Sequence, residues 1–465
     1  MTIMNVHGDF EKDYLELLND FHNHKLDAGD LNAYREEMLH EVFKYVKVHS
    51  EYYGTKFKDI DEAEFALNGL SSLPFTTKAD LREAETGILS GKLKDSGYYY
   101  ETTGTTGKAT LCLRNKNDII RINNSIMEGV KPLLQKVSAL SQKAIGIMGP
   151  TELHSTGDTI GKIFLDMDYC IFKIWPYSPV VGFKKTLQLL RDHQIEVLLG
   201  TPGVVQTLYK ASIKYGYAIS DFNIKVILLI GEMCTAEMQR NIGNIWSADV
   251  YNFLYGSQEV GHAAVLAPDR KFYTLPFNYM YEIVEVEGDR LLSSGESGEL
   301  VLTMIQPNSA KPLIRYRTGD VAILHAHVHN HLGCSQQIEF KGRIKDLITI
   351  ENKTYYPEDI ENIIMRHFNT CIGYQITIDH ENGTDRVAID LEFASPVNSS
   401  ELNHLQQEWI HTIGGKCQIY AVDELEAIAN LGALVSWKSA RITDKRCAED
   451  SEKTVARTLA ANRGY

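Results

Sequence analysis

Three short apolar runs constrain the fold of this chain more than any other feature of its sequence. They read AIGIMG, IEVLLG and VILLIG, at residues 144–149, 195–200 and 226–231, and each ends in glycine. Runs of this length, rich in branched side chains, are typical of strands buried on both faces of a parallel sheet. Because helical patterns alternate with them from about residue 118 to 260, we predict an α/β fold with helices on both faces of the sheet. Ligands usually bind at the carboxyl ends of such strands.

The flanking segments follow other patterns. Residues 10–50 carry apolar side chains at three- and four-residue steps, which predicts helix, and Thr77 is a candidate cap for the helix after it. Residues 280–325 alternate polar and apolar side chains around glycine-rich turns, which predicts antiparallel strands. After them, a helix at YYPEDIENIIMRHF, a hairpin turning near residue 382 and a helix at SSELNHLQQEWIHTI predict a small α+β unit.

Composition and charge exclude several classes of protein. The chain has 465 residues, 44% hydrophobic and 23% charged, with a formal net charge of −14. This acidic balance argues against a general nucleic-acid-binding protein, which needs a basic surface. No signal peptide is visible at the start, and the apolar runs are shorter than the roughly 20 residues of a membrane helix. Seven scattered cysteines without a C-x-x-C pair fit a reducing compartment. We therefore expect a cytoplasmic protein with neither nucleic acid nor membrane as a partner.

The segment YYYETTGTTGKAT, residues 98–110, is too polar and glycine-rich to form a core. It is not a Walker A loop, because only two residues separate Gly104 from Gly107 and alanine follows Lys108. Its backbone N–H groups and hydroxyls suit a phosphate chain. A plain surface turn would have the same composition, so the residues alone leave both interpretations open.

Six stretches, taken together, resemble the adenylate-forming superfamily, which includes the acyl- and aryl-CoA synthetases. One of the six is the upstream region, where HEVFKYVKVHSEYYGTKF and LPFTTKADLREA are similar to the N-terminal region of the phenylacetate-CoA ligase branch. The other five stretches are TTGTTGKAT at 102–110, GE at 231–232, YGSQE at 255–259, YRTGD at 316–320 and GRIKDLI at 342–348. The resemblance implies a large N-terminal domain of mixed sheets and flanking helices at residues 1–341, a small mobile α+β C-terminal domain at 342–446, and a tail at 447–465.

The resemblance also implies a reaction. A carboxylic acid, by analogy aromatic or heteroaromatic, would attack the α-phosphate of ATP to give an acyl-adenylate and pyrophosphate. The acyl group would then pass to CoA, to an amine or to a carrier-protein thiol, with Mg²⁺ as the metal. A binding module that keeps the nucleotide site without turnover is the alternative of a different class.

Roles for the matched residues follow from the resemblance. Glu259 would bind Mg²⁺, Asp320 would accept both ribose hydroxyls, and Arg343 would add positive charge near ribose and phosphate. Taken alone, Asp320 and Arg343 would be an ordinary surface ion pair. The β- and γ-phosphates would be held by Thr102, Thr103, Gly104, Thr105, Thr106, Gly107 and the catalytic Lys108. The adenine would be flanked by Gly231, Glu232 and Tyr255, and Gly256 and Ser257 would also contact the nucleotide.

A second catalytic lysine is implied near the C-terminus, where it would bind the carboxylate and α-phosphate oxygens in the transition state. Aligning ARITDKR with the family's ending gives Lys438, with Trp437 in place of the usual glycine; a solvated surface lysine is the rival interpretation. Lys345 takes the hinge position. Asn352 replaces a glycine that helps to admit the CoA pantetheine arm. Because asparagine tolerates the left-handed backbone, we expect the turn to persist, and the acceptor stays open.

Two histidine-containing segments raise further hypotheses. The acid is expected near His154, although a lone histidine is equally consistent with a satisfied loop residue; the other pocket segments are Thr201, Pro202, Gly203, 231–234 and 255–261. In HAHVHNHLGC, the histidines at 325, 327, 329 and 331 share a strand face and Cys334 follows. Alternate strand residues lie about 6.6 Å apart, too far for all to reach one ion. A polar surface ribbon is therefore favoured over a zinc site.

Overall fold

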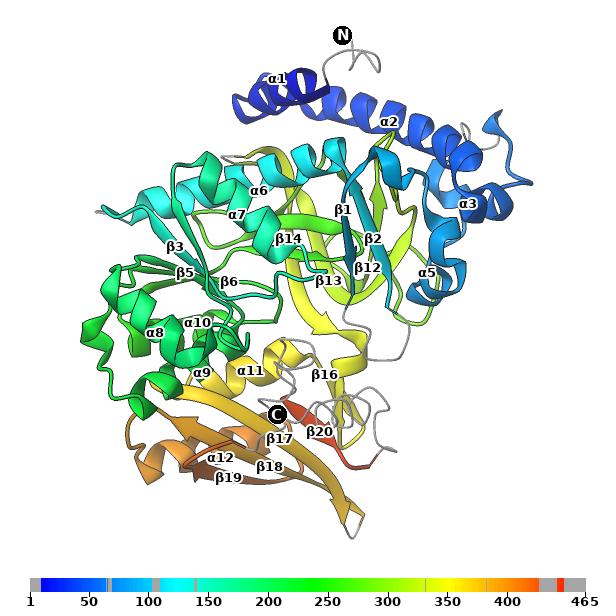
Figure 1. Ribbon diagram of the computed structural model, residues 1–465. Coiled ribbons are helices and arrows are strands. Elements are labelled where there is room, and N and C mark those ends of the chain that lie inside the picture. Colours follow the sequence, from blue (N-terminus) through cyan, green and yellow to red (C-terminus); the bar gives the residue numbers. More distant parts are fainter. Residues whose placement is uncertain are drawn as a thin grey trace.

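A computed structural model describes residues 10–63, 65, 69–102, 109–137, 140–330, 332–381, 383–425 and 441–446. Their strands form a five-stranded parallel sheet, a seven-stranded antiparallel sheet, a four-stranded mixed sheet and two small hairpins. The predicted α/β class with mixed sheets is therefore confirmed. In Figure 1, the N-terminal helices lie along the top, the two large sheets in the middle and the C-terminal sheet at the bottom.

The parallel sheet contains the three apolar runs, as predicted. Its strands are ordered β4 (Cys170–Lys173), β3 (Ala144–Ile147), β5 (Val197–Gly200), β6 (Val226–Leu229) and β7 (Asp249–Asn252). One apolar face packs against α6 (Lys116–Lys136) and α7 (Thr156–Asp166). The other packs against α8 (Gly182–Asp192), α9 (Pro202–Lys214) and α10 (Ala236–Trp246). Helices therefore cover both faces, which explains why these strands are apolar throughout.

The seven-stranded sheet contains the alternating segment after residue 280, which is antiparallel as predicted. Its order is β11 (Tyr279–Val284), β12 (Ser297–Met304), β13 (Tyr316–Asn330), β14 (Gly333–Arg343), β10 (Phe272–Thr274), β9 (Gly261–Leu266) and β8 (Leu254–Ser257). A separate hairpin is formed by β1 (Ser96–Glu101) and β2 (Leu111–Asn115).

The N-terminal helices cover this second sheet and share an apolar core with it. They are α1 (Phe10–His22), α2 (Ala28–His49), α3 (Glu51–Lys56) and α5 (Lys78–Ala84). The helical region is divided at Asp27, whose carboxylate accepts from the N–H of Asp30 and caps α2. Thr77 caps α5 as predicted, through a hydrogen bond from the N–H of Asp80. Single 3₁₀ turns occur at Gly69–Ser72, Glu85–Ile88, Leu93–Asp95, Ile219–Asp221 and Ile344–Asp346.

The C-terminal region has the predicted helix–hairpin–helix order. It comprises the hairpin β15 (Ile348–Ile350) and β16 (Lys353–Tyr355), helix α11 (Pro357–Met365), strands β17 (Cys371–Glu381) and β18 (Thr384–Phe393), helix α12 (Ser399–Thr412), and strands β19 (Lys416–Val422) and β20 (Ile442–Asp444). Its apolar core is continuous with that of α9 and α10. Among the described residues, no helix has both the length and the apolar character needed to cross a bilayer.

Candidate functional site

The carboxyl ends of the parallel strands bring several predicted site residues to one edge of the sheet. Thr201 follows β5 directly, Gly231 and Glu232 follow β6, and Tyr255 follows β7. His154 lies on the loop between β3 and α7. Thr201 caps α9, since its hydroxyl accepts from the N–H of Val204 at 3.2 Å, and Pro202 and Gly203 are buried in the first turn of that helix. This edge is where ligands of open α/β sheets bind.

The neck of the threonine-rich loop is closed by two hydrogen bonds between its ends. The Thr102 N–H donates to the Thr110 carbonyl at 3.0 Å, and the Thr110 N–H donates to the Thr102 hydroxyl at 2.9 Å. The Glu101 N–H donates to the Leu153 carbonyl at 2.9 Å, which ties the loop to the segment carrying His154. Thr103, Gly104, Thr105, Thr106, Gly107 and Lys108 lie outside the described residues, so their predicted contacts with phosphate stay predictions.

Asp320 lies between an aromatic hydroxyl and a guanidinium group. The Tyr255 hydroxyl donates to Asp320 Oδ2 at 2.6 Å, and Arg343 Nε lies 3.5 Å from Asp320 Oδ1. Asp320 and Arg343 are opposite each other on β13 and β14, and the Tyr255 ring stacks on Phe340 with centroids 3.8 Å apart. Burial and the Asp320 charge raise the pKa of Tyr255 well above its ordinary value, so the phenol remains a donor. The Asp320 carboxylate is thus held by β8, β13 and β14 together.

Glu259 is a buried carboxylate that faces two lysines. Its Oε1 lies 3.2 Å from Nζ of Lys78, the first residue of α5. Burial alone would raise the pKa of Glu259, but Lys78, Lys311 and local hydrogen bonds lower it to about 2. An ionised carboxylate is a ligand that Mg²⁺ prefers, so the chemistry of this group fits the predicted metal role.

Lys311 places a second positive charge beside strand β2. It is fully buried, and its Nζ donates to the Leu111 carbonyl at 3.0 Å and contacts Cys112 Sγ at 3.4 Å. Burial lowers the pKa of Lys311 and raises that of the Cys112 thiol. Both contacts are on β2, which leaves the loop at its C-terminal end. Lys311 therefore fixes the strand and supplies positive charge on the same side as Glu259.

The turn between β8 and β9 requires its glycine. A Cβ on Gly256 would lie 2.2 Å from the Gly261 carbonyl oxygen and 2.8 Å from the Cα of His262. The Ser257 hydroxyl accepts from the Val260 N–H at 3.4 Å and holds the turn closed. The close pairing and the tight turn fix the positions of Tyr255 on β8 and of Glu259 in the turn.

A buried charge cluster joins the parallel sheet to the C-terminal region. Arg441 Nη2 lies 3.3 Å from Glu232 Oε2, and Nη1 donates to Glu361 Oε2. The Tyr374 hydroxyl donates to the same Glu361 oxygen at 3.0 Å, and the Thr235 N–H donates to the other at 2.8 Å. Burial alone would lower the pKa of Arg441, but Glu361, Tyr374 and Glu232 raise it above its ordinary value. Glu232, predicted to flank the nucleotide, is here the partner of a C-terminal arginine.

The remaining C-terminal predictions divide into described and undescribed residues. Lys345 lies on the 3₁₀ turn directly after β14. Asn352 has φ +64°, as expected for the left-handed turn, and Glu351 beside it has φ +47°. Two such residues between β15 and β16 form the two-residue hairpin turn expected of this conformation. Lys438 and the tail at 447–465 lie outside the described residues, and the boundary at 341/342 stays a prediction.

The histidine-rich ribbon forms the end of the β13–β14 hairpin. His327 and His329 are exposed, and His325 Nε2 lies 2.8 Å from Glu339 Oε1 across the pair. His331 lies outside the described residues, and the described ones contain no group of three or more metal-ligating side chains. The ribbon is polar, as the favoured interpretation expected.

Lys78, Lys311, Arg114 and Arg441 were missed by sequence reasoning. Lys78 lies inside LPFTTKADLREA, from which only the cap at Thr77 was predicted. Arg441 lies inside ARITDKR, which served only to align Lys438. A charged residue inside a matched stretch was therefore the available signal. No comparable signal marks Lys311, because its partners lie on β2, far away in the sequence.

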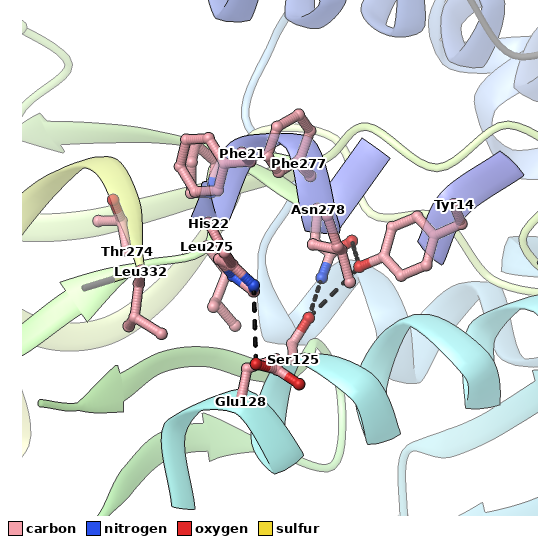
Figure 2. A pocket seen from close by; sticks show the side chains of 12 residues that line it. Tyr14, Phe21, His22, Ser125, Glu128, Thr274, Leu275, Phe277, Asn278 and Leu332 are labelled. Atoms are coloured by element: carbon pink, nitrogen blue, oxygen red, sulfur yellow. Dashed lines mark hydrogen bonds and ion pairs between the residues drawn. The ribbon is translucent and has the colours of Figure 1, made fainter. Parts of the chain in front are cut away.

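A small cavity lies elsewhere, between α1, α6 and the loop before β11 (Figure 2). Tyr14 donates to Asn278, Asn278 donates to Ser125, and His22 Nδ1 lies 3.6 Å from Glu128 Oε2. The cavity encloses about 20 Å³, which is room for about one water molecule. Its position and size separate it from the site at the sheet edge.

The amino-acid sequence is similar to those of known proteins. Residues 353–446 match the family of the AMP-binding enzyme C-terminal domain. The phenylacetate-coenzyme A ligase of Thermus thermophilus is 24% identical over 385 residues, which cover 79% of this chain and 82% of that protein. The enzyme of the same name from Pseudomonas putida is 23% identical over 420 residues, covering 87% and 89%. The chain is therefore similar to the phenylacetate-CoA ligases over most of its length.

Solved structures of a CoA ligase and of an amido synthetase share the fold of this chain. It aligns with 2-hydroxyisobutyryl-CoA ligase in the postadenylation state with 2-HIB-AMP at a TM-score of 0.73 and 17% identity, covering 94% of this chain and 92% of the other. It aligns with the AtGH3.15 acyl acid amido synthetase in complex with 2,4-DB at 0.65 and 14%, covering 98% and 97%. The fold implied by the sequence motifs is therefore confirmed over nearly the whole chain.

Proposed function

We propose that this chain is an adenylate-forming ligase that activates an aromatic or heteroaromatic carboxylic acid with Mg²⁺ and ATP and then transfers the acyl group to CoA. The first step joins a carboxylate oxygen to the α-phosphorus and releases pyrophosphate, giving an acyl-adenylate. In the second step the acceptor's nucleophile forms a bond to the acyl carbon and AMP leaves. Both reactants of the first step are anionic, so the site must supply positive charge and align the groups.

The observation that carries the proposal is the held carboxylate of Asp320. Tyr255 and Arg343 fix both of its oxygens, and a fixed carboxylate suits the two hydroxyls of a ribose. Tyr255 and Glu259 lie on the same hairpin, so a nucleotide whose sugar binds Asp320 would extend its phosphates toward Glu259 and the neck of the threonine-rich loop. Mg²⁺ on Glu259 would neutralise phosphate charge.

The other predicted site residues complete the proposal, and two of them, Lys108 and Lys438, lie outside the described part of the chain. Lys108 and its loop would hold the β- and γ-phosphates, and Lys438 would bind the carboxylate and α-phosphate oxygens. The C-terminal region, taken as 342–446, would turn about Lys345 between the two steps. His154 and the residues at 201–203 would line the acid. We also propose a cytoplasmic location, in keeping with the scattered cysteines.

The acceptor is the least constrained part. The name of the relatives supports CoA, whereas a solved structure of similar fold is an amido synthetase. The left-handed turn at Asn352 keeps the backbone shape that the family obtains with glycine, and this supports CoA as the first acceptor to test. An amine or a carrier-protein thiol is the alternative outcome.

The decisive experiment incubates the full chain with Mg²⁺, ATP and a library of carboxylic acids. Pyrophosphate release is measured, and mass spectrometry identifies the bound adenylate; CoA, amines and a carrier protein are then offered to it. We expect release with a subset of aromatic acids, and Lys438→Ala to abolish it while ATP binding persists. If ATP binds but no acid triggers release, the chain is a non-catalytic binding module. Unchanged turnover in Lys438→Ala would remove that lysine from the mechanism.

A further inference from the structure

Three buried polar atoms beside the site lack a hydrogen-bond partner among the described residues. They are Arg114 Nη1, Gln258 Nε2 and His262 Nδ1. Other atoms of two of these side chains are fixed: Arg114 Nη2 donates to the Gln258 carbonyl at 2.8 Å, and Gln258 Oε1 is hydrogen-bonded to the Ser155 hydroxyl. Buried polar atoms without partners are rare in native proteins, because each loses its hydration without compensation.

The three side chains are neighbours on or beside the β8–β9 hairpin. His262 pairs with Gly256 across the hairpin, and Gln258 lies in its turn. Arg114 projects from β2 to the same turn, where it also donates to the Glu259 carbonyl at 3.3 Å. The ribose end of the proposed site lies where Tyr255, on β8, meets Asp320.

The surroundings place these atoms on the acyl side. Ser155 adjoins His154, and the Leu153 carbonyl is bound by the strand leading into the threonine-rich loop. The hairpin turn therefore contacts β2, through Arg114, and the segment proposed for the acid, through Ser155. An acyl group attached to the α-phosphate would extend from the phosphates toward this turn.

The chemistry of the three atoms specifies what could satisfy them. Arg114 Nη1 is a donor, Gln258 Nε2 is a donor while Oε1 accepts from Ser155, and a neutral histidine nitrogen donates or accepts. Burial, with the charges of Arg114 and His154, lowers the pKa of His262 to about 3, so the ring is neutral near pH 7. At least two of the three atoms are thus donors that lack an acceptor among the described residues. A purely hydrocarbon ring would leave them unpaired.

We propose that Gln258 and His262, supported by Arg114, bind a hydrogen-bond acceptor on the acyl part of the acid. This inference rests on the proposed function and narrows its substrate class to acids that carry a hydroxyl, carbonyl or ring-nitrogen group besides the reacting carboxylate. Acids with an unsubstituted hydrocarbon ring are the disfavoured class. A site built to hydrogen-bond a substrate group discriminates strongly against the analogue lacking it.

The test uses matched acids that differ only in the acceptor. The pairs are quinoline-2-carboxylate and 2-naphthoate, 2-pyridylacetate and phenylacetate, and 2-hydroxyisobutyrate and pivalate. For each, kcat/KM of pyrophosphate release is measured with the full chain, and calorimetry measures binding of the corresponding acyl-sulfamoyl-adenosines, which needs no turnover. We expect the polar member to be favoured at least tenfold in one pair or more, and Gln258→Leu and His262→Leu to reduce that preference below about threefold.

The control is Gln306→Leu, another buried glutamine with an unpartnered amide oxygen among the described residues. It should keep the wild-type preference, which separates loss of the acceptor from general disturbance of the core. Equal or reversed preference in every pair, no binding of either member, or a preference that survives both site variants would overturn the inference. Absence of pyrophosphate release with selective binding intact would instead refute the proposed function alone.

Discussion

Arg441 forms an ion pair with Glu232 across the boundary between the C-terminal sheet and the parallel sheet, with Nη2 3.3 Å from Oε2. The same guanidinium binds Glu361, which is fully buried. One cation therefore neutralises two carboxylates, one from helix α11 and one from the loop after β6. Removing the cation would take the guanidinium away from Glu361, a carboxylate that is fully buried.

We expect Arg441→Met to destabilise the chain by about 3–5 kcal/mol, the cost typical of breaking a buried ion pair from one side. The measurement is the free energy of unfolding in urea. Arg386→Met is the matched control, because Arg386 pairs with Glu381 where both side chains are about half exposed, and such pairs contribute only about 0–1 kcal/mol. Equal losses of unfolding free energy in the two variants would show that the buried Arg441 cluster stabilises the chain no more than an exposed ion pair does.

The ionised Glu259 side chain should stabilise the metal-free protein in a pH-dependent way. Its pKa in the folded chain is about 2, below the ordinary 4.5, so the stabilisation is complete above about pH 4.5 and is lost as the pH falls toward 2. We expect the difference in unfolding free energy between wild type and Glu259→Gln to be larger at pH 6 than at pH 3, by on the order of 2 kcal/mol. The measurement uses denaturant unfolding in EDTA, and a difference independent of pH would contradict the assignment.

The hydroxyl of Tyr255 should contribute to nucleotide binding through Asp320. Tyr255→Phe keeps the ring on Phe340 but removes the donor to the carboxylate, and a hydrogen bond to a charged group is consistent with about tenfold weaker binding. Calorimetric titration with AMP measures the change. Tyr273→Phe serves as the control, since its hydroxyl donates to Asp269 at 2.8 Å on the loop before β10. A loss in the control as large as in Tyr255→Phe would make the effect non-specific.

Gly256 should not tolerate a side chain. A Cβ there would lie 2.2 Å from a carbonyl oxygen, so the hairpin must open, and we expect Gly256→Ala to cost about 1–3 kcal/mol in stability and to lower adenylation. The comparison is Gly161→Ala in α7, where the nearest atom lies 3.7 Å away and alanine should stabilise the helix by up to about 1 kcal/mol. Thermal unfolding of the two variants should therefore shift in opposite directions; a shared direction would count against the packing argument.

The regular elements were predictable because their signals are local. The apolar runs at 144–149, 195–200 and 226–231 became β3, β5 and β6, and the alternating segment after residue 280 became β11 to β13. The cap at Thr77 and the left-handed turn at Asn352 also depend on a few neighbouring residues. Local rules of conformation are sufficient for features of this kind.

The charge partners were not predictable, since they depend on how distant elements pack. Glu232 was expected beside the nucleotide because of its motif, but its pairing with Arg441 joins residues on different sheets. Lys78 likewise reaches Glu259 only because α5 packs close to β13. Periodicity and motif order carry no information about such contacts, which need the tertiary arrangement.

The pairing of β13 and β14 has a consequence for movement. It sets Arg343 opposite Asp320, and the turn proposed as the pivot begins at the next residue. When a body swings about a point, the arc that each atom travels grows with its radius from that point. Rotation at Lys345 would thus displace Arg343 hardly at all. The strands of the C-terminal region that lie farthest from Lys345 would move the most. The sugar end of the nucleotide would stay anchored, and only the surroundings of the reacting carbon would be exchanged between the two half-reactions.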